Sequence, residues 1–463
     1  METLKKLPLG IQDFDKLIQG GYLYVDKTES IHRMVTGSSA QFLSRPRRFG
    51  KSLLVSTLEA IFQGRRKLFE GLWIGQSDYD WPAHPVIHLD LSLIDPRSVE
   101  ELEHGLIWLL TESARQHELE PGRFHRAAAM FDDLIVRLAD GKGPVVVLVD
   151  EYDRPILDHL ADTALALDIR DWLQNFYAIL GARNEYLRFV FLTGVSRFSR
   201  MPSVSGIGRL MDISRDSGYG ALLGITRSEL ESDFAGYIHA AARRGGETVP
   251  ELLARIREWY KGYRFHPASE RVYNPFSFLS YLEKRKFGHW WFETGTPDFL
   301  AGLARSSSFP IAGIERRTFP ESAFAHFEAG NLDLLPLLYL TGYLTIAGYD
   351  EAKERYALNY PNREIRESFF THLMGLDPNA KKRNTTDPKR KAAPRMGNPN
   401  KKAVSVGRDW KMRTGRTRRR GHLFSRAFLS KVSKIPKRVG EIFRYLSGKI
   451  SLLRKSLRRG YRR

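Results

Sequence analysis

Short apolar runs alternate with amphipathic stretches through the first half of the chain. Four of these runs lack the polar alternation of a half-exposed strand, and we expect each to form a buried strand: residues 41–43, 85–89, 145–149 and 189–192. Residues 51–62 instead space their leucines and isoleucine as a helix does. Buried strands that alternate with helices are typical of a parallel sheet covered on both faces. The pattern therefore predicts an α/β fold.

The pattern changes near residue 226. Amphipathic helices are expected over 229–244 and 252–260, and residues 342–346 and 355–358 flank a turn with Asp350 as a β-hairpin would. Helices followed by a hairpin would fit a winged-helix arrangement. We therefore expect three parts: a sheet domain over 1–226, a mainly helical lid or winged-helix domain over 227–373, and a C-terminal tail over 374–463.

The basic charge of the chain is concentrated in that tail. Residues 381–463 contain 29 lysines and arginines against three acids, a net charge of +26, whereas the whole chain carries +20. The stretch up to residue 420 has almost no apolar clusters, so we expect it to be disordered. Apolar residues then recur at steps of three and four over 424–457, which predicts a basic amphipathic helix. The tail could bind nucleic acid, lie on an anionic membrane, or have no selected partner.

The residue types and segments that the sequence lacks exclude several kinds of site. It has no cysteine, so disulfides, thiolate metal sites and a cysteine nucleophile are ruled out. Its 13 histidines form no zinc-binding motif. The first ten residues contain no apolar signal region, and no run approaches the roughly 18 apolar residues of a membrane span. We expect a cytoplasmic protein without a transmembrane segment.

A phosphate-binding loop is predicted between the first strand and the first long helix. The usual pattern is G-x-x-x-x-G-K-[ST], and here an arginine stands at the first glycine. Gly50 would let the backbone approach a phosphate, Lys51 would reach the β- and γ-phosphates, and Ser52 would bind magnesium. The alternative is an ordinary helix start. The residues predicted to bind ATP are Arg45, Pro46, Arg47, Arg48, Phe49, Gly50, Lys51 and Ser52.

A second half of the site is predicted at the end of the strand over 145–149. Two carboxylates, Asp150 and Glu151, follow this strand directly. Asp150 would hold the magnesium through water, and Glu151 would polarise the attacking water as general base. A strand ending in a solvated acidic turn is the alternative. The presence of Lys51 and Ser52 upstream favours the catalytic interpretation.

A third element follows the strand over 189–192. In ATPases with an extra strand between the two that carry these motifs, a polar side chain at this strand end senses the γ-phosphate. Thr193 or Ser196 could do so, and Arg197 could stabilise charge in the transition state. These residues could equally cap the strand. The predicted catalytic residues are therefore Glu151, Lys51, Thr193 and Arg197.

Ten short motifs together resemble those of the bacterial and archaeal AAA-ATPase-like proteins. They are LPLGIQDF (7–14), YVDKT (24–28), RPRRFGKS (45–52), VDEYD (149–153), TGVSRFS (193–199), WYKGYRF (259–265), YNPFS (273–277), TGTP (294–297), TGYLT (341–345) and YPNRE (360–364). The resemblance covers residues 1 to about 373, and an arginine at the first loop glycine is typical of this family. Residues 205–210 depart from the family pattern, so nothing is transferred there.

The resemblance implies an ATPase that uses ATP and magnesium. Relatives often continue into a nuclease-like domain of the PD-(D/E)XK superfamily, whereas this chain continues into the basic tail. Asp409 and Lys411 imitate part of a nuclease motif, but no strands or helices are predicted around them, so we expect no nuclease activity. The abrupt change is also what a shifted reading frame would produce.

Two function classes follow. In the first, the protein hydrolyses ATP and couples hydrolysis to a movement of the helical domain. In the second, it is a nucleotide-dependent switch or a nucleic-acid-associated binding module with little turnover, in which occupancy alone sets the conformation. The oligomeric state is left open by the sequence.

Overall fold

The computed structural model describes residues 4–196, 210–294, 313–322 and 334–373. By its internal contacts the chain divides into two compact units, Met1–Pro388 and Lys389–Arg463. All described residues belong to the first unit. Arg197 and the tail over 374–463 lie outside them, so the predictions made for these residues stay predictions.

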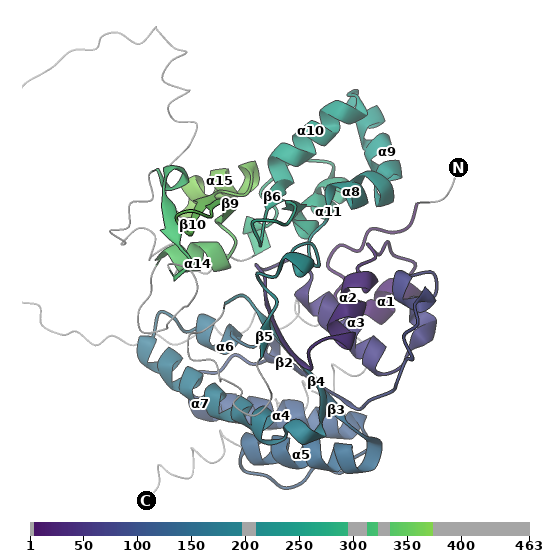
Figure 1. The fold of residues 1–463 in the computed structure, drawn as a ribbon, viewed down its shortest axis with the longest axis vertical. Helices are drawn as coiled ribbons and strands as arrows, with labels where there is room; N and C mark the ends of the chain where they lie inside the picture. The colour runs from purple at the N-terminus through teal and green to yellow at the C-terminus, as the bar shows by residue number, and fades with distance from the viewer. Residues whose placement is uncertain (1–3, 197–209, 295–312, 323–333, 374–463) are drawn as a thin grey trace, which may run out of the picture. The chain divides into compact units, whose positions relative to one another are not determined.

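A five-stranded parallel sheet forms the centre of the described unit (Figure 1). Its strands are β1 (Ala40–Ser44), β2 (Val86–Asp90), β3 (Val145–Asp150), β4 (Leu187–Gly194) and β5 (Met211–Asp212). The order across the sheet is β2-β3-β4-β1-β5, so β4 lies between β1 and β3. Every position of β1 and β3 is buried, including the polar residues Gln41 and Ser44 of β1 and Asp150 of β3, as expected of strands covered on both faces. The predicted α/β fold with a parallel sheet is confirmed.

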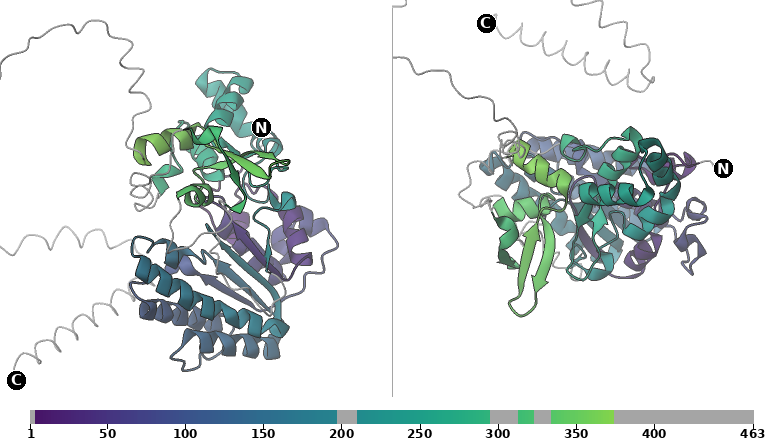
Figure 2. Two further views of the ribbon diagram at one scale, coloured as in Figure 1. Left: turned by 60° about the vertical axis from the view of Figure 1, so that its left-hand side comes forward. Right: turned by 90° about the horizontal axis from the view of Figure 1, so that it is seen from above.

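Helices cover the sheet on two sides (Figures 1 and 2). On one side lie α1 (Phe14–Gln19), α2 (Thr28–Thr36) and α3 (Lys51–Phe62). On the other lie α4 (Val99–Gln116), α5 (Ala127–Lys142) and α7 (Thr163–Ala182), which pack on one another, and α6 (Arg154–Leu157) is a short turn after β3. Side chains cap several of these helices: Ser98 accepts from the amide of Glu101 at the start of α4. The predicted helix over 51–62 is α3.

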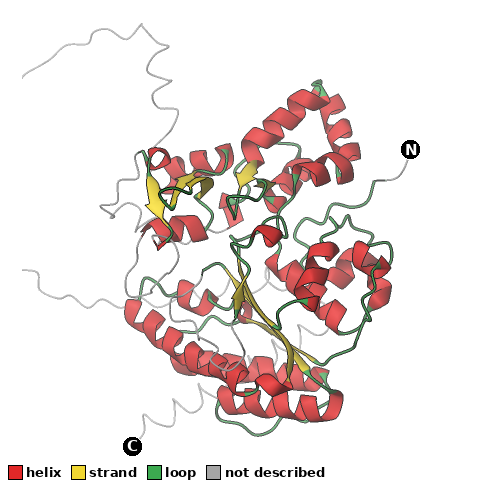
Figure 3. Ribbon diagram, viewed as in Figure 1, coloured by secondary structure: helices red, strands yellow, loops and turns green. Residues whose placement is uncertain are grey.

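Four helices after the sheet surround an apolar core of their own. They are α8 (Arg227–Asp233), α9 (Ala235–Gly245), α10 (Val249–Tyr260) and α11 (Pro275–Lys284), and a small hairpin of β6 (Lys261–Tyr263) and β7 (Val272–Tyr273) separates the last two (Figure 3). Capping boxes begin α8 at Thr226 and α10 at Thr248.

The single helix predicted over 229–244 is wrong. The structure has two helices that meet at Phe234, whose backbone leaves the helical region with φ −108° and ψ 9°. Phe234 is buried, and its ring packs edge-on against Phe278 at a centroid distance of 5.0 Å. Tertiary packing at this position therefore overrides a continuous helical pattern.

The last described segment adds a three-stranded antiparallel sheet of order β8-β10-β9. Its elements are β8 (Thr318–Pro320), α14 (Leu334–Leu340), β9 (Thr345–Asp350), β10 (Arg355–Asn359) and α15 (Arg363–Ser368). The predicted hairpin is confirmed as β9 and β10. Buried residues of this segment, such as Leu338, Ile346 and Phe369, belong to the same core as the parallel sheet. The segment is thus packed with the sheet, whereas α8–α11 have a separate core.

Short turns complete the described backbone. Single 3-10 turns cover Arg66–Phe69, Trp73–Gln76, Leu91–Leu93, Asn184–Tyr186, Ser217–Tyr219, Phe292–Thr294 and Ile314–Arg316, and a π-helical turn covers Phe369–Leu373. Among the described helices, none combines the length and the apolar character needed to cross a membrane.

Gly262 marks a close approach between β6 and the residues before α15. Its φ is +144°, and a Cβ at this position would lie 1.7 Å from the carbonyl oxygen of Pro361. No side chain fits there without moving the backbone. This glycine therefore allows the end of α10 and the start of α15 to pack together.

We predict that Gly262→Ala lowers the stability of the protein by roughly 2 kcal/mol or more, because it adds both backbone strain and overlap. The shift of the urea denaturation midpoint measures this effect. Gly141→Ala is the matched control, since a Cβ on this residue of α5 would meet no atom within 4 Å. The control should gain up to about 1 kcal/mol of helix stability. Equal midpoints for the two variants would contradict the close approach.

Candidate nucleotide-binding site

The predicted phosphate loop connects β1 to α3. Gly50 precedes the first residue of α3 and has φ +95°, a conformation that L-residues rarely adopt. Arg48 also has a left-handed backbone, with φ +66°. The amides at the start of α3 have no partner within the helix, and the helix dipole is positive at this end. The local chain therefore provides the geometry that binds anions at a helix start.

A cavity of about 540 Å³ opens in front of this loop. One part of its lining is polar and charged, with residues 47–52 of the loop together with Asp90, Glu151 and Arg154. The other part is apolar and comes from the N-terminal segment, the residues before α8, and α11: Leu9, Ile11, Val25, Leu222, Ile225 and Phe276. A volume of several hundred Å³ with one charged and one apolar side is typical of a small-molecule site.

Lys51 and Glu151 meet at the polar side of the cavity. The Lys51 Nζ atom lies 3.2 Å from Oε1 of Glu151 and donates to the carbonyl oxygen of Arg45 at 3.3 Å. The Lys51 side chain is only 3% exposed. Burial alone would raise the pKa of Glu151, but the ion pair with Lys51, helped by Arg47 and Arg154, lowers it below its usual value. Glu151 is therefore an ionised carboxylate at neutral pH.

Asp150 and Ser52 meet beside this pair. Asp150 ends β3 and is 2% exposed. Burial and the neighbouring charge of Glu151 raise the pKa of Asp150 to about 6, against a hydrogen bond with Ser52 and the charge of Lys51, which lower it. A hydroxyl and a carboxylate in contact are two of the oxygen ligands that Mg²⁺ prefers.

These two residues fit a magnesium ion that is bound together with a phosphate. No group of three or more acidic or histidine side chains that could hold a metal ion occurs within the described ranges. Mg²⁺ typically takes one or two protein ligands and completes its shell with substrate phosphates and water. The side chains of Ser52 and Asp150 match that requirement.

Asp153 is a buried residue two positions after Glu151, and no role was predicted for it from the sequence. Its carboxylate is fully buried and accepts from the backbone amides of Val195 and Ser196, at 3.1 and 2.6 Å, and from the Ser196 hydroxyl at 2.6 Å. It thereby ties the end of β3 to the loop after β4. A Cβ on Gly194 would lie 2.2 Å from Asp153, so a glycine is needed beside it. The sequence feature that could have indicated a role for Asp153 is its position in the family motif VDEYD (149–153).

The structure does not bring Thr193 or Ser196 to the cavity. The hydroxyl of Thr193 donates to the carbonyl oxygen of Leu43 on the adjacent strand at 2.8 Å. The hydroxyl of Ser196 donates to Asp153. Both hydroxyls therefore have acceptors within the fold, and neither residue lines the cavity. A sensor role for Thr193 stays a prediction, and Arg197 lies outside the described residues.

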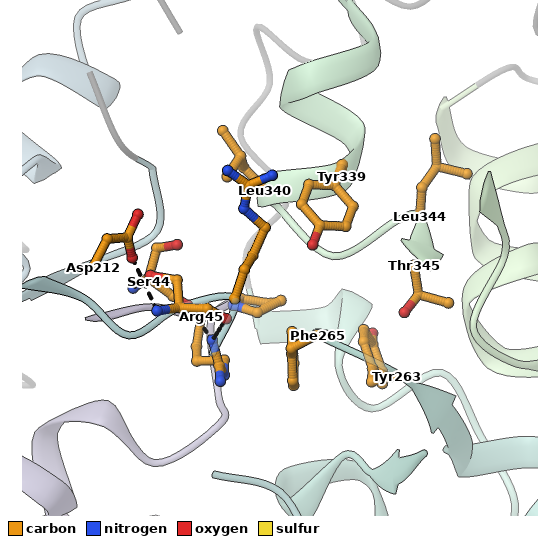
Figure 4. A pocket seen from close by; sticks show the side chains of 12 residues that line it. Ser44, Arg45, Asp212, Tyr263, Phe265, Tyr339, Leu340, Leu344 and Thr345 are labelled. Carbon is orange, nitrogen blue, oxygen red and sulfur yellow. Dashed lines mark hydrogen bonds between the residues drawn. The ribbon is translucent and has the colours of Figure 1, made fainter. Parts of the chain in front are cut away.

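Arg45 is likewise absent from the lining of this cavity and instead lines a second, smaller one (Figure 4). Its guanidinium is buried and donates to the carbonyl oxygens of Ser214 and Tyr219 at 2.7 and 3.0 Å, while its plane lies 4.0 Å from the ring centroid of Phe265. Its own amide donates to Gly194 at 3.1 Å. Burial lowers the pKa of Arg45 to about 10, so it stays charged.

Arg45 and Pro46 therefore differ from the rest of the predicted loop. Both line a separate cavity of about 40 Å³, beside Tyr263 and Tyr339, whereas residues 47–52 line the large one. The expectation that Arg45 and Pro46 bind nucleotide is not supported by this placement. The physical reason is that an arginine at the first glycine position is long enough to turn back into the protein and satisfy carbonyl groups there.

A strand, a loop and a helix that begins with Lys51 and Ser52, together with a buried strand that ends at Asp150 and is followed by Glu151, define a P-loop ATPase fold. A family model described as a predicted AAA-ATPase matches residues 8–203. A protein from Azotobacter chroococcum mcd 1, named only by its position in the vnfD 5' region, is 39% identical over 375 residues, which cover 80% of this chain and 70% of that protein. The chain belongs to the predicted AAA-ATPase family, as its motifs indicate.

Two solved structures show a weaker likeness. The Aeropyrum pernix ORC2 protein, in ADPNP and ADP complexes, is 13% identical with a TM-score of 0.32, covering 83% of this chain and 97% of its own. The Aeropyrum pernix ORC1 protein in complex with DNA is 12% identical with a TM-score of 0.27, covering 75% and 92%. Likeness at this level carries no information about ligands.

We predict that Asp153→Ala destabilises the protein by roughly 3 kcal/mol, because three buried donors lose a charged acceptor. Urea denaturation monitored by tryptophan fluorescence measures the change. Asp171→Ala is the control: Asp171 pairs with Arg170 at 2.6 Å, but its side chain is 61% exposed. The control should change stability by no more than about 0.5 kcal/mol. A loss in Asp153→Ala as small as that of the control would show that Asp153 does not hold the loop.

Proposed function

We propose that this protein binds ATP with magnesium in the 540 Å³ cavity and hydrolyses it. The observation that carries the proposal is the contact between Lys51 and Glu151 at the mouth of the phosphate loop. Lys51 would supply the positive charge that a triphosphate needs, and Glu151 is a carboxylate that could accept a proton from the attacking water. The remaining lining supports the same ligand.

The charged side of the cavity suits a phosphate chain. Backbone amides at the start of α3 would bind phosphate oxygens, and Lys51 would neutralise the β- and γ-phosphates. Arg47 adds positive charge beside them, where its guanidinium lies 3.7 Å from Asp158. Ser52 and Asp150 would hold the magnesium ion, which when bound neutralises charge on the phosphates.

The apolar side of the cavity suits a nucleotide base. Leu9, Val25 and Ile225 offer apolar surface, and the guanidinium carbon of Arg48 lies 5.0 Å from the ring centroid of Phe276. A base between such groups gains from burial and from stacking. The base would lie at the end of the cavity away from Glu151.

The ion pair suggests how Glu151 becomes active. Without nucleotide, Lys51 neutralises Glu151 and lowers its pKa. A γ-phosphate would offer Lys51 a second anionic partner, which would weaken its hold on the carboxylate. The pKa of Glu151 would then rise, and its oxygens would be available to accept a proton from water. The pair would thus keep the base inactive until the phosphate arrives.

We also propose that hydrolysis is coupled to movement of the helical part. The cavity wall includes Phe234, Phe276 and Leu279 from α8–α11, which have a core of their own, as well as residues of the sheet. A ligand in contact with both would favour one arrangement of the two. Within the predicted helical domain, 227–373, the moving part would be α8–α11. A winged-helix role for α14, β9, β10 and α15 is part of the same proposal, as is a sensor role for the end of β4.

The second candidate is a nucleotide-dependent switch with little turnover. The observation that favours it is the engagement of the Thr193 and Ser196 hydroxyls by Leu43 and Asp153, because no polar side chain of β4 then reaches the attacking water. In that case ATP occupancy alone would set the conformation that a partner recognises.

We predict that Lys51→Ala weakens ATP binding by about 100-fold or more, because the triphosphate loses its main cation. Glu151→Gln should bind ATP within about threefold of the wild type, yet lower magnesium-dependent phosphate release by about 100-fold or more. Glu100→Gln, an exposed residue of α4, is the control and should change neither quantity.

Equilibrium binding of a fluorescent ATP analogue and single-turnover phosphate release measure the two effects. Unchanged turnover in Glu151→Gln would show that Glu151 is not the general base. A wild-type protein that binds ATP tightly but releases no phosphate would favour the switch instead.

We further propose nucleic acid as a partner of the tail. The support is the net charge of +26 over residues 381–463, set against a slightly acidic remainder. The full chain should bind a DNA duplex with an affinity that falls steeply and log-linearly with salt, and a chain ending at residue 373 should lose most of that affinity and slope. Equal slopes would exclude the tail as the contact surface. Binding to anionic vesicles, but not to DNA or RNA, would indicate a membrane instead.

A further inference from the structure

Trp291 lies between the phosphate loop and α15. Its indole Nε1 donates to the carbonyl oxygen of Arg47 at 3.0 Å. Its backbone amide donates to Oε1 of Glu364 at 2.7 Å. The side chain is buried, and its ring packs edge-on against Tyr343 at 5.1 Å. One residue thus uses both of its N–H groups on two segments that are far apart in the sequence.

Glu364 is the fixed end of this arrangement. It is fully buried in α15, a helix whose N-cap residue is Asn362, and the Asn362 side chain accepts from the amide of Ile365 at 3.0 Å. Burial raises the pKa of Glu364 to about 8, although the hydrogen bond from the Trp291 amide acts to lower it. At neutral pH it is mainly a neutral acid that accepts a hydrogen bond. A glutamine would reproduce that state closely.

Two further residues of the phosphate loop, Pro46 and Phe49, flank the hydrogen bond between Trp291 and Arg47 and also have contacts with later segments of the chain. A Cβ on Gly342 would lie 2.7 Å from Cβ of Pro46, so the backbone of the segment after α14 is close to the loop. The ring of Phe49 packs edge-on against Tyr263 at 4.8 Å. Pro46, Arg47 and Phe49 are therefore all held by residues that do not line the 540 Å³ cavity.

The bond to Arg47 differs from ordinary packing of an aromatic ring. Apolar burial of an indole does not require its N–H to reach a particular carbonyl group, and a phenyl ring would fill much of the same space. Here the acceptor is a loop carbonyl, three residues before the glycine that approaches the phosphates. Fixing this carbonyl fixes the peptide plane between Arg47 and Arg48, and Arg48 already has an uncommon left-handed backbone.

We propose that Trp291 and Glu364 are positioning residues of the nucleotide site. Glu364 holds the backbone of Trp291, and the Trp291 indole holds the Arg47 carbonyl, so the loop keeps its binding conformation while α15 is packed in place. Neither residue touches the ligand. The proposal rests on ATP binding by this loop, and it adds a route by which the C-terminal segment and the nucleotide affect each other.

Trp291→Phe tests the link, because it keeps an aromatic ring and removes the indole donor. We expect about a tenfold weaker affinity for the fluorescent ATP analogue and a matching rise in the KM for ATP, with a smaller change in kcat. Trp290→Phe is the control: its indole donates to the carbonyl oxygen of Lys286 within its own loop, at 3.2 Å. The control should bind as the wild type does, and equal affinities of the two variants would overturn the proposal.

Two variants of Glu364 test its part in the arrangement. Glu364→Gln should bind ATP within about twofold of the wild type, whereas Glu364→Leu should weaken binding about as much as Trp291→Phe. The double variant of Trp291→Phe with Glu364→Leu should be no weaker than either single one, because the link is already broken. Additive losses would overturn the proposal. If Glu364→Leu does not fold, the contrast between Trp291→Phe and Glu364→Gln decides the same point.

A measurement without nucleotide separates this proposal from the proposed function. Hydrogen exchange of the amides over residues 47–50 should be faster in Trp291→Phe than in Trp290→Phe and the wild type. Failure of the wild type to bind ATP would contradict the proposed function, yet faster exchange would still show that Trp291 holds the loop. Unchanged exchange in Trp291→Phe would overturn the positioning role whatever the ligand is.

Discussion

The pairing of Lys51 with Glu151 is the constraint around which the described structure is arranged. The Lys51 side chain is only 3% exposed, and burying its charge without a counter-charge would be costly. Its counter-charge is Glu151, which directly follows β3. The start of α3 must therefore lie against the end of β3. Parallel strands meet this demand, because their carboxyl ends share one edge of the sheet and each is followed by a crossover helix. The cavity lies at this edge of the sheet, where residues that follow β1 and β3 line it.

The loop before Lys51 is supported by Arg45 and Trp291, two residues that do not line the cavity. Arg45 turns into the protein and satisfies the carbonyl oxygens of Ser214 and Tyr219, while Trp291 satisfies that of Arg47. A glycine-rich loop would leave these carbonyl groups to other partners. Side chains thus take over part of the role that backbone flexibility has in the usual motif, and they connect the loop to residues that are distant in the chain.

Much of this could be anticipated from local patterns. The four apolar runs, the helix over 51–62 and the hairpin after α14 agree with the structure, because a fully buried strand appears as an apolar run without polar alternation and a helix as a periodic pattern. The family that the motifs indicate agrees with the matching family model. The predictions were weakest where a single buried contact decides. Phe234 divides one amphipathic pattern into two helices, because its buried ring packs against Phe278.

The sequence by itself determined the four buried strands, the helix over 51–62, and the local order of Lys51–Ser52 and Asp150–Glu151 at the ends of these elements, since each of these is encoded within a few neighbouring residues. Only the tertiary structure decided which side chains meet. Asp153 bonds to a residue 43 positions away, and Trp291 bonds to one 244 positions away. Such pairs leave no periodic signal, because a hydrogen bond depends on where two chain segments are brought in space and not on the residues next to either partner.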